Sequence, residues 1–239
     1  MRNNKKNIIS IFVFAIIFLL VISLILLNNS LKKTNIEIDE EKIYYEIEYF
    51  DSQLVYMINL LNNVQQIDDF YINWSELEKN TQILTNYWNS VILDFNYLDI
   101  DKNYLTSFGK NLDTLYISIK NKEKDNTLNN IIALYDFLII YSETLNNYYN
   151  NIILNIKYNL LIAYSIVEKN NWTLTNEYII KASEDMANML NSIGNNKYNQ
   201  YNINQAYIAI KELENIINEK NIDLFYLKYN IANKKIEQL

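Results

Sequence analysis

The sequence predicts an all-α protein, with an N-terminal transmembrane helix followed by a domain of about eight antiparallel helices. Three observations predict this fold class. The 239-residue chain has no proline and two glycines, so almost nothing in it interrupts helices. An uncharged apolar run lies near the N-terminus. Beyond that run, apolar residues recur at alternating spacings of three and four, which is the period of an amphipathic helix.

The N-terminal apolar run is predicted to be a transmembrane signal anchor, residues 7–27. As a helix, "IISIFVFAIIFLLVISLILL" would be about 30 Å long and would match the apolar core of a bilayer. Basic residues before it favour a cytoplasmic N-terminus. A cleaved signal peptide is the alternative, but its apolar region is normally shorter and ends at small residues. We expect a single-pass protein of the cell membrane, with residues 1–6 cytoplasmic, residues 28–38 a linker and residues 39–239 an extracytoplasmic helical domain.

Eight seams, each a row of apolar residues at helical spacing, follow the linker, and polar residues separate each seam from the next. The seams begin at Ile43, Trp74, Leu105, Ile131, Ile153, Ile179, Ile203 and Leu224. Their short connections predict antiparallel neighbours, arranged either as stacked helical hairpins or as a bundle. Gly194 and the polar residues after it give the clearest helix end. Asp223 is expected to cap the last helix.

Two stretches repeat the pattern Asn-Trp-Ser/Thr, "INWSELEKN" at residues 72–80 and "NNWTLTNEY" at residues 170–178. In each stretch the asparagine precedes an apolar seam and is a good N-cap residue. In the first stretch, Ser75 and Glu78 could instead form a capping box. Both stretches therefore indicate the start of a helix.

The tryptophans of these stretches fall on the first turn, where they face a neighbouring helix. Large aromatic residues at helical spacing usually fill cores, so we expect Trp74 and Trp172 to pack in the core rather than to bind a ligand. Replacing either by alanine is expected to lower the free energy of unfolding by about 3–5 kcal/mol.

The sequence predicts no catalytic, cofactor-binding or metal-binding residue. It has no Cys and no His, which excludes disulfides, the usual zinc sites and Ser-His or Cys-His catalysis. "DIDKNYLTSFGK" at residues 99–110 begins like a calcium loop, but Tyr104 and Lys110 stand where that loop needs Gly and Glu. A loop followed by a helix cap explains it better.

Acidic residues occur in close pairs that could in principle perform acid–base chemistry. The pairs are Glu76 with Glu78, Glu184 with Asp185, and Glu212 with Glu214. Positions one or two apart point to different sides of a helix, so no pair converges on one point. Asp136, inside "IIALYDFLIIY", is the acidic residue to test, because a buried carboxylate needs a partner, although we expect it to face outward.

Charge restricts the partners of the domain. From Thr34 onward there are 16 basic and 28 acidic residues, a net charge of −12, which repels nucleic acid. We therefore expect a non-enzymatic binding or interaction module with a protein or peptide partner. A ligand-sensing or accessory subunit of a membrane signalling or transport complex is the first alternative. A hydrolase using carboxylates is the second, for which the sequence has residue types but no arrangement.

The sequence resembles known proteins in two respects. "AYSIVEKNNWTLTNEYIIKA", residues 163–182, resembles a tetratricopeptide-type helical hairpin, although no 34-residue period recurs along the chain. The order of "INWSELEK", "TNYWNSVI", "AYSIVEKNNW" and "IDLFYLKY" is similar to that in a group of membrane-anchored helical envelope proteins of clostridia and related Firmicutes. The second resemblance implies an extracytoplasmic helical domain and brings no activity or site residues.

Overall fold

The structure is a computed structural model, and its described part covers most of the predicted domain. The described residues are 23, 39–62, 72–98, 100–145, 148–192 and 197–239. Apart from Ser23, the predicted transmembrane segment lies outside them. Within the described ranges, no helix is both long enough and apolar enough to span a bilayer. Contacts within the chain group Asp39–Leu239 as one compact unit.

The described part of this unit is all-α, as the sequence predicts. It has eight α-helices, one short 3-10 helix and no strand. The elements are α2 (Glu40–Asn62), α3 (Trp74–Phe95), α4 (Lys102–Lys120), α5 (Lys124–Glu143), α6 (Tyr148–Val167), α7 (Trp172–Ser192), α8 (Lys197–Asn215), η2 (Ile217–Glu219) and α9 (Ile222–Ile236).

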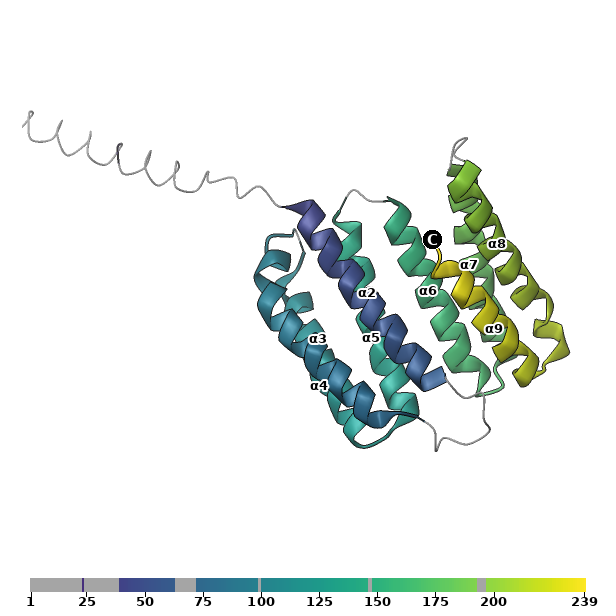
Figure 1. The fold of residues 1–239 in the computed structure, drawn as a ribbon, viewed down its shortest axis with the longest axis horizontal. Helices are drawn as coiled ribbons and strands as arrows, with labels where there is room; N and C mark the ends of the chain where they lie inside the picture. The colour runs from purple at the N-terminus through teal and green to yellow at the C-terminus, as the bar shows by residue number, and fades with distance from the viewer. Residues whose placement is uncertain (1–22, 24–38, 63–71, 99, 146–147, 193–196) are drawn as a thin grey trace, which may run out of the picture. The chain divides into compact units, whose positions relative to one another are not determined.

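The helices form two consecutive four-helix bundles (Figure 1). In the first bundle, α2 to α5, each helix packs against the next and α2 packs back on α5. The second bundle, α6 to α9, closes in the same way, with α6 packed on α9. Packing of α5 against α6 joins the two. The described helices of the domain therefore form a pair of closed bundles rather than an open stack of hairpins.

The two bundles have the same register of buried residues. In the last three helices of each bundle, a constant offset of 98 residues relates buried positions: Leu84 and Ala182, Trp88 and Met186, Leu105 and Ile203, Leu112 and Ile210, Ile131 and Tyr229, and Leu138 and Ile236. Between α2 and α6 the offset is 106, as for Phe50 and Ile156 or Leu54 and Leu160. The offset is larger there because more residues connect α2 to α3 than connect α6 to α7. The second bundle therefore repeats the first structurally.

The core of the first bundle contains a cluster of aromatic side chains. The Trp88 ring centroid lies 4.4 Å from that of Phe108, and Phe50 lies 5.1 Å from Phe108. Gly109 on α4 leaves room for the Trp88 ring, because a Cβ at that position would make a tight contact of 3.3 Å with Trp88 Nε1. These side chains are almost completely buried, so they contribute a large part of the hydrophobic stabilisation.

Asparagine side chains cap the helices that follow the Asn-Trp pattern. Asn73 Oδ1 accepts a hydrogen bond from Glu76 N at 3.1 Å, and Asn171 Oδ1 accepts one from Leu174 N at 3.2 Å. The prediction that both stretches begin helices is confirmed. In the alternative capping box, Glu78 would bond back to the helix start, but its carboxylate lies 3.0 Å from Lys120 Nζ.

Two other cap predictions have different outcomes. Asn221 caps α9 by accepting a hydrogen bond from Leu224 N at 3.0 Å, so the prediction that Asp223 is the cap was wrong. Asp223 lies inside the first turn instead, where a carboxylate also suits the helix dipole. In the calcium-like stretch, Asp101 caps α4 and the residues from Lys102 onward are helical. That stretch is therefore a helix start, as expected.

Candidate functional site

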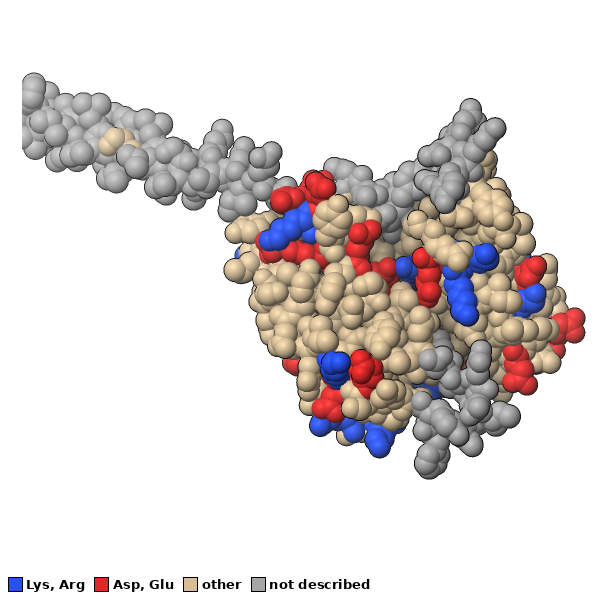
Figure 2. All heavy atoms as spheres, in the orientation of Figure 1, with Lys and Arg blue, Asp and Glu red and all other residues tan. Residues whose placement is uncertain are grey.

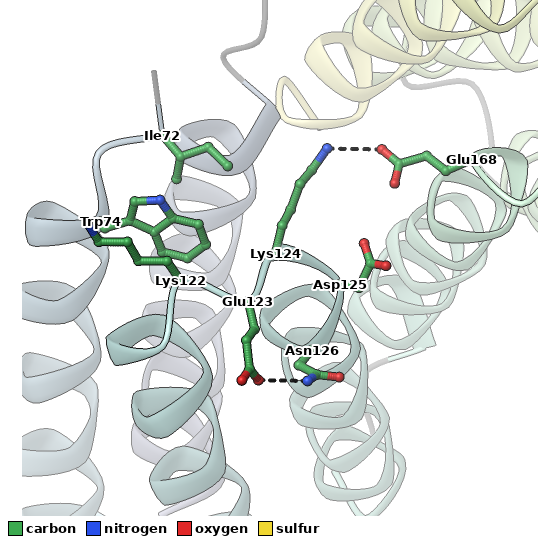
Figure 3. Close-up of a pocket in the computed structure, with 8 residues that line it drawn as sticks. All are labelled: Ile72, Trp74, Lys122, Glu123, Lys124, Asp125, Asn126 and Glu168. Atoms are coloured by element: carbon green, nitrogen blue, oxygen red, sulfur yellow. Dashed lines mark hydrogen bonds and ion pairs between the residues drawn. The ribbon is translucent and has the colours of Figure 1, made fainter. Parts of the chain in front are cut away.

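A hollow of about 780 Å³ lies where the start of α3, the turn between α4 and α5, and the end of α6 come together. Its lining residues are Ile72, Trp74, Lys122, Glu123, Lys124, Asp125, Asn126 and Glu168. Figure 3 shows Ile72 and Trp74 on one wall and Glu168 on the opposite wall, with the first residues of α5 between them. Residues of both bundles therefore line the hollow.

The turn between α4 and α5 contains a residue in the left-handed backbone conformation, just before α5 begins beside the hollow. Lys122 has φ 58°, and Lys220, 98 residues later, has φ 48° at the matching turn of the second bundle. The N-cap residue of α5, Glu123, does not cap the helix with its side chain. Its carboxylate instead accepts a hydrogen bond from Asn126 Nδ2 at 2.7 Å. The first N–H groups of α5 are therefore left uncapped beside the hollow.

Glu168 connects the two bundles at the far wall. Its Oε1 lies 3.0 Å from Lys124 Nζ and accepts a hydrogen bond from the Tyr226 hydroxyl at 3.0 Å. Burial, followed by the charge of Glu168, raises the pKa of Tyr226 well above its ordinary value, so this phenol remains a neutral donor. These contacts hold the wall in place.

Two charged side chains at the hollow have no partner among the described residues. Lys122 and Asp125 make no side-chain hydrogen bond or ion pair there, and both are exposed. Trp74 is half-buried and packs against the core, so part of its ring faces the hollow. The hollow thus offers a cation, an anion and an aromatic surface.

The tryptophans of the repeated pattern are less buried than expected. Trp74 and Trp172 are both only partly buried, and Trp172 packs edge-on against Phe225 with ring centroids 6.3 Å apart. Trp88, which is 3% exposed, is the core tryptophan. The prediction of core packing is thus correct only in part, because a residue on the first turn of a helix lies at the end of the bundle.

The acidic pairs do not form a site. Four of these carboxylates make separate ion pairs: Glu76 with Lys79, Glu78 with Lys120, Glu212 with Lys228, and Glu214 with Lys211. Asp136 is exposed, in agreement with the expected outward position, and it interacts with Tyr158. In the described part of the chain, no group of three or more His, Cys, Asp or Glu residues could hold a metal ion.

The structure brings together a polar cluster that sequence reasoning missed. Asp51 on α2 accepts a hydrogen bond from the Tyr135 hydroxyl at 2.9 Å, and Lys157 on α6 forms an ion pair with the same carboxylate. Lys157 interrupts an apolar run, which was a signal of a special position. Its partner lies 106 residues away in the sequence and could not be found from periodicity.

Comparison with known proteins gives no relative. No protein family, no curated protein and no solved structure matches the chain. The chemistry of the hollow and the pattern of the sequence are therefore the basis for a functional proposal.

Proposed function

We propose that the protein is a single-pass membrane protein whose helical domain, residues 39–239, lies outside the cell and binds a protein or peptide partner. The uncharged N-terminal run, residues 7–27, and the basic residues before it support the anchor and its orientation. The acidic domain supports a partner other than nucleic acid. Residues 1–6 are then cytoplasmic and residues 28–38 are the linker.

The hollow at Trp74 is the proposed binding site. Its volume of about 780 Å³ lies within the usual range for ligand sites. The half-buried ring of Trp74 can cover an apolar group, while Lys122 and Asp125 are available for charged groups. An aromatic surface beside unpaired charges of both signs suits a ligand that is itself both apolar and charged.

A peptide with free termini has this chemistry. Its carboxylate would bind Lys122 and the uncapped N–H groups at the start of α5, where the helix dipole also favours an anion. Its ammonium group would bind Asp125. The other cation of the hollow, Lys124, is already paired with Glu168, so it holds the wall rather than the ligand.

Trp74 fluorescence tests this proposal directly. The full chain in lipid nanodiscs would carry Trp88→Phe and Trp172→Phe, so that Trp74 is the remaining tryptophan. Trialanine with free termini would be titrated as a probe of peptide chemistry. We expect a saturable change of emission, and weaker binding when the probe is acetylated at its N-terminus or amidated at its C-terminus.

The internal repeat provides matched controls. Lys122→Met and Asp125→Asn should each weaken binding of trialanine at least about tenfold, as expected for loss of a charged hydrogen bond. Lys220→Met and Asp223→Asn, at the equivalent positions of the second bundle, should leave the affinity for trialanine unchanged. An unchanged Trp74 spectrum at millimolar trialanine, or equal effects at the two sets of positions, would count against the hollow as a peptide site.

A further inference from the structure

Glu46 on α2 is a buried carboxyl group without a full set of partners. The residue is 3% exposed, and its Oε2 atom has no hydrogen-bond partner among the described residues. Asp94 lies opposite it near the end of α3. Lys42 Nζ is 2.8 Å from Asp94 Oδ2 but 3.9 Å from Glu46 Oε1. An ionised Glu46 would therefore lose hydration that the protein does not replace.

The internal repeat shows that the fold does not require a carboxyl group at this position. The residue equivalent to Glu46 in the second bundle, 106 residues later, is Ile152, and it is buried with 9% of its surface exposed. The same helix position is thus filled by an apolar side chain in one bundle and by an acid in the other. Packing alone explains Ile152 and leaves Glu46 without an explanation.

We propose that Glu46 and Asp94 together bind one proton, and that this proton holds the first turns of α2 against α3. With the proton present, Glu46 donates a hydrogen bond to Asp94, and the charge of Asp94 is balanced by Lys42. Without it, two carboxylates face one ammonium group. Glu46 then regains hydration only when the start of α2 moves away from α3.

The surroundings of the site are mainly acidic and aromatic. A hollow of about 340 Å³ beside it is lined by Asp39, Glu41, Lys42, Tyr45, Glu46 and Tyr87. Figure 2 shows acidic atoms gathered at the end of the domain where α2 begins, with basic atoms beside them. On α5, the charged residue at this end of the helix is the exposed Glu143. These groups add negative potential and so favour binding of a proton.

Burial, and then the charge and hydrogen bond of Asp94, raise the pKa of Glu46 to about 7, while Lys42 opposes the rise. In the unfolded chain the same group has its ordinary value of 4.5. The folded form therefore binds more protons between these two values. The stabilisation from the proton is present in full below the lower value and is lost as the pH rises through the upper one. The device therefore operates around neutral pH.

Two measurements on the full chain in lipid nanodiscs test the proposal. The first is the 13C resonance of the Glu46 carboxyl carbon, which should titrate near pH 7 and at a lower pH when Asp94→Asn removes the neighbouring charge. Titration of Glu46 at its ordinary value would overturn the proposal.

The second measurement uses the absence of natural cysteine. Ile47→Cys places a thiol at a position of α2 that is 3% exposed, and its labelling rate is compared with and without Glu46→Gln. The ratio cancels the pH dependence of the thiol. We expect the labelling rate with Glu46, relative to that with Glu46→Gln, to rise by at least about tenfold from pH 5 to pH 8. A ratio that does not change with pH, or an equal rise at a control Ile156→Cys in the second bundle, would contradict a local release of α2.

Discussion

Asp51 and Lys157 occupy equivalent positions in the two bundles and form an ion pair with each other. The carboxylate lies on the first helix of one bundle and the ammonium group on the first helix of the other, 106 residues apart. Their side chains are 17% and 12% exposed. Identical bundles would place two like charges at this contact, so opposite residues here allow the two copies to pack together.

Reversing one charge of this pair should weaken the packing of one bundle against the other and so lower the free energy of unfolding. Asp51→Lys is expected to lower the free energy of unfolding by about 3–5 kcal/mol, because two ammonium groups then share a largely buried site. The double variant Asp51→Lys with Lys157→Asp should recover most of that loss. Urea unfolding of the single and double variants measures the coupling. If the double variant is no more stable than Asp51→Lys alone, the ion pair does not join the bundles.

The three tryptophans should differ in their contribution to stability. Trp88→Ala is expected to lower the free energy of unfolding by about 3–5 kcal/mol, since this side chain is buried among other rings. Trp74→Ala and Trp172→Ala should cost about 1–2 kcal/mol, less than expected from the sequence, because part of each ring already contacts water in the folded protein. Urea unfolding measures all three. Equal losses would contradict the placement of Trp74 at the rim of a hollow.

Each asparagine cap should contribute a smaller amount. Asn73→Ala and Asn171→Ala each remove a side-chain acceptor for a backbone N–H at the start of a helix, and each should lower stability by about 1 kcal/mol. Asn86→Ala, at an exposed position inside α3, is the matched control and should have almost no effect. Thermal unfolding followed by circular dichroism is sufficient to compare them. A control variant as unstable as the cap variants would rule out a capping role.

The helices of the domain could be predicted from the sequence because each buries one seam of side chains, and the spacing of such a seam is a local property. Seven of the eight expected seams begin inside the helices that the structure shows at those positions, and the eighth begins at Trp74, the first residue of its helix. Exact ends were harder. For example, Asn221 rather than Asp223 caps α9, so this helix begins one residue before Asp223.

The candidate site could not be predicted, since it depends on contacts between distant segments. Trp74, Lys122 and Glu168 lie on separate elements, and closure of two bundles brings them together. The repeat itself did leave a signal in the sequence: 98 residues separate the two Asn-Trp pairs and also separate Lys122 from Lys220. Glu46 gave no signal, because the width of the buried face of α2 depends on how closely α3 packs against it.

Thiol labelling shows directly on which side of the membrane the helical domain lies. The natural chain has no cysteine, so Ser52→Cys, at an exposed position of α2, and Asn4→Cys can be compared in intact cells with a membrane-impermeant maleimide. With the domain outside the cell, position 52 is labelled in intact cells, and position 4 is labelled only after the cells are permeabilised. The reverse pattern, or protection of both positions until permeabilisation, would contradict an outward-facing domain.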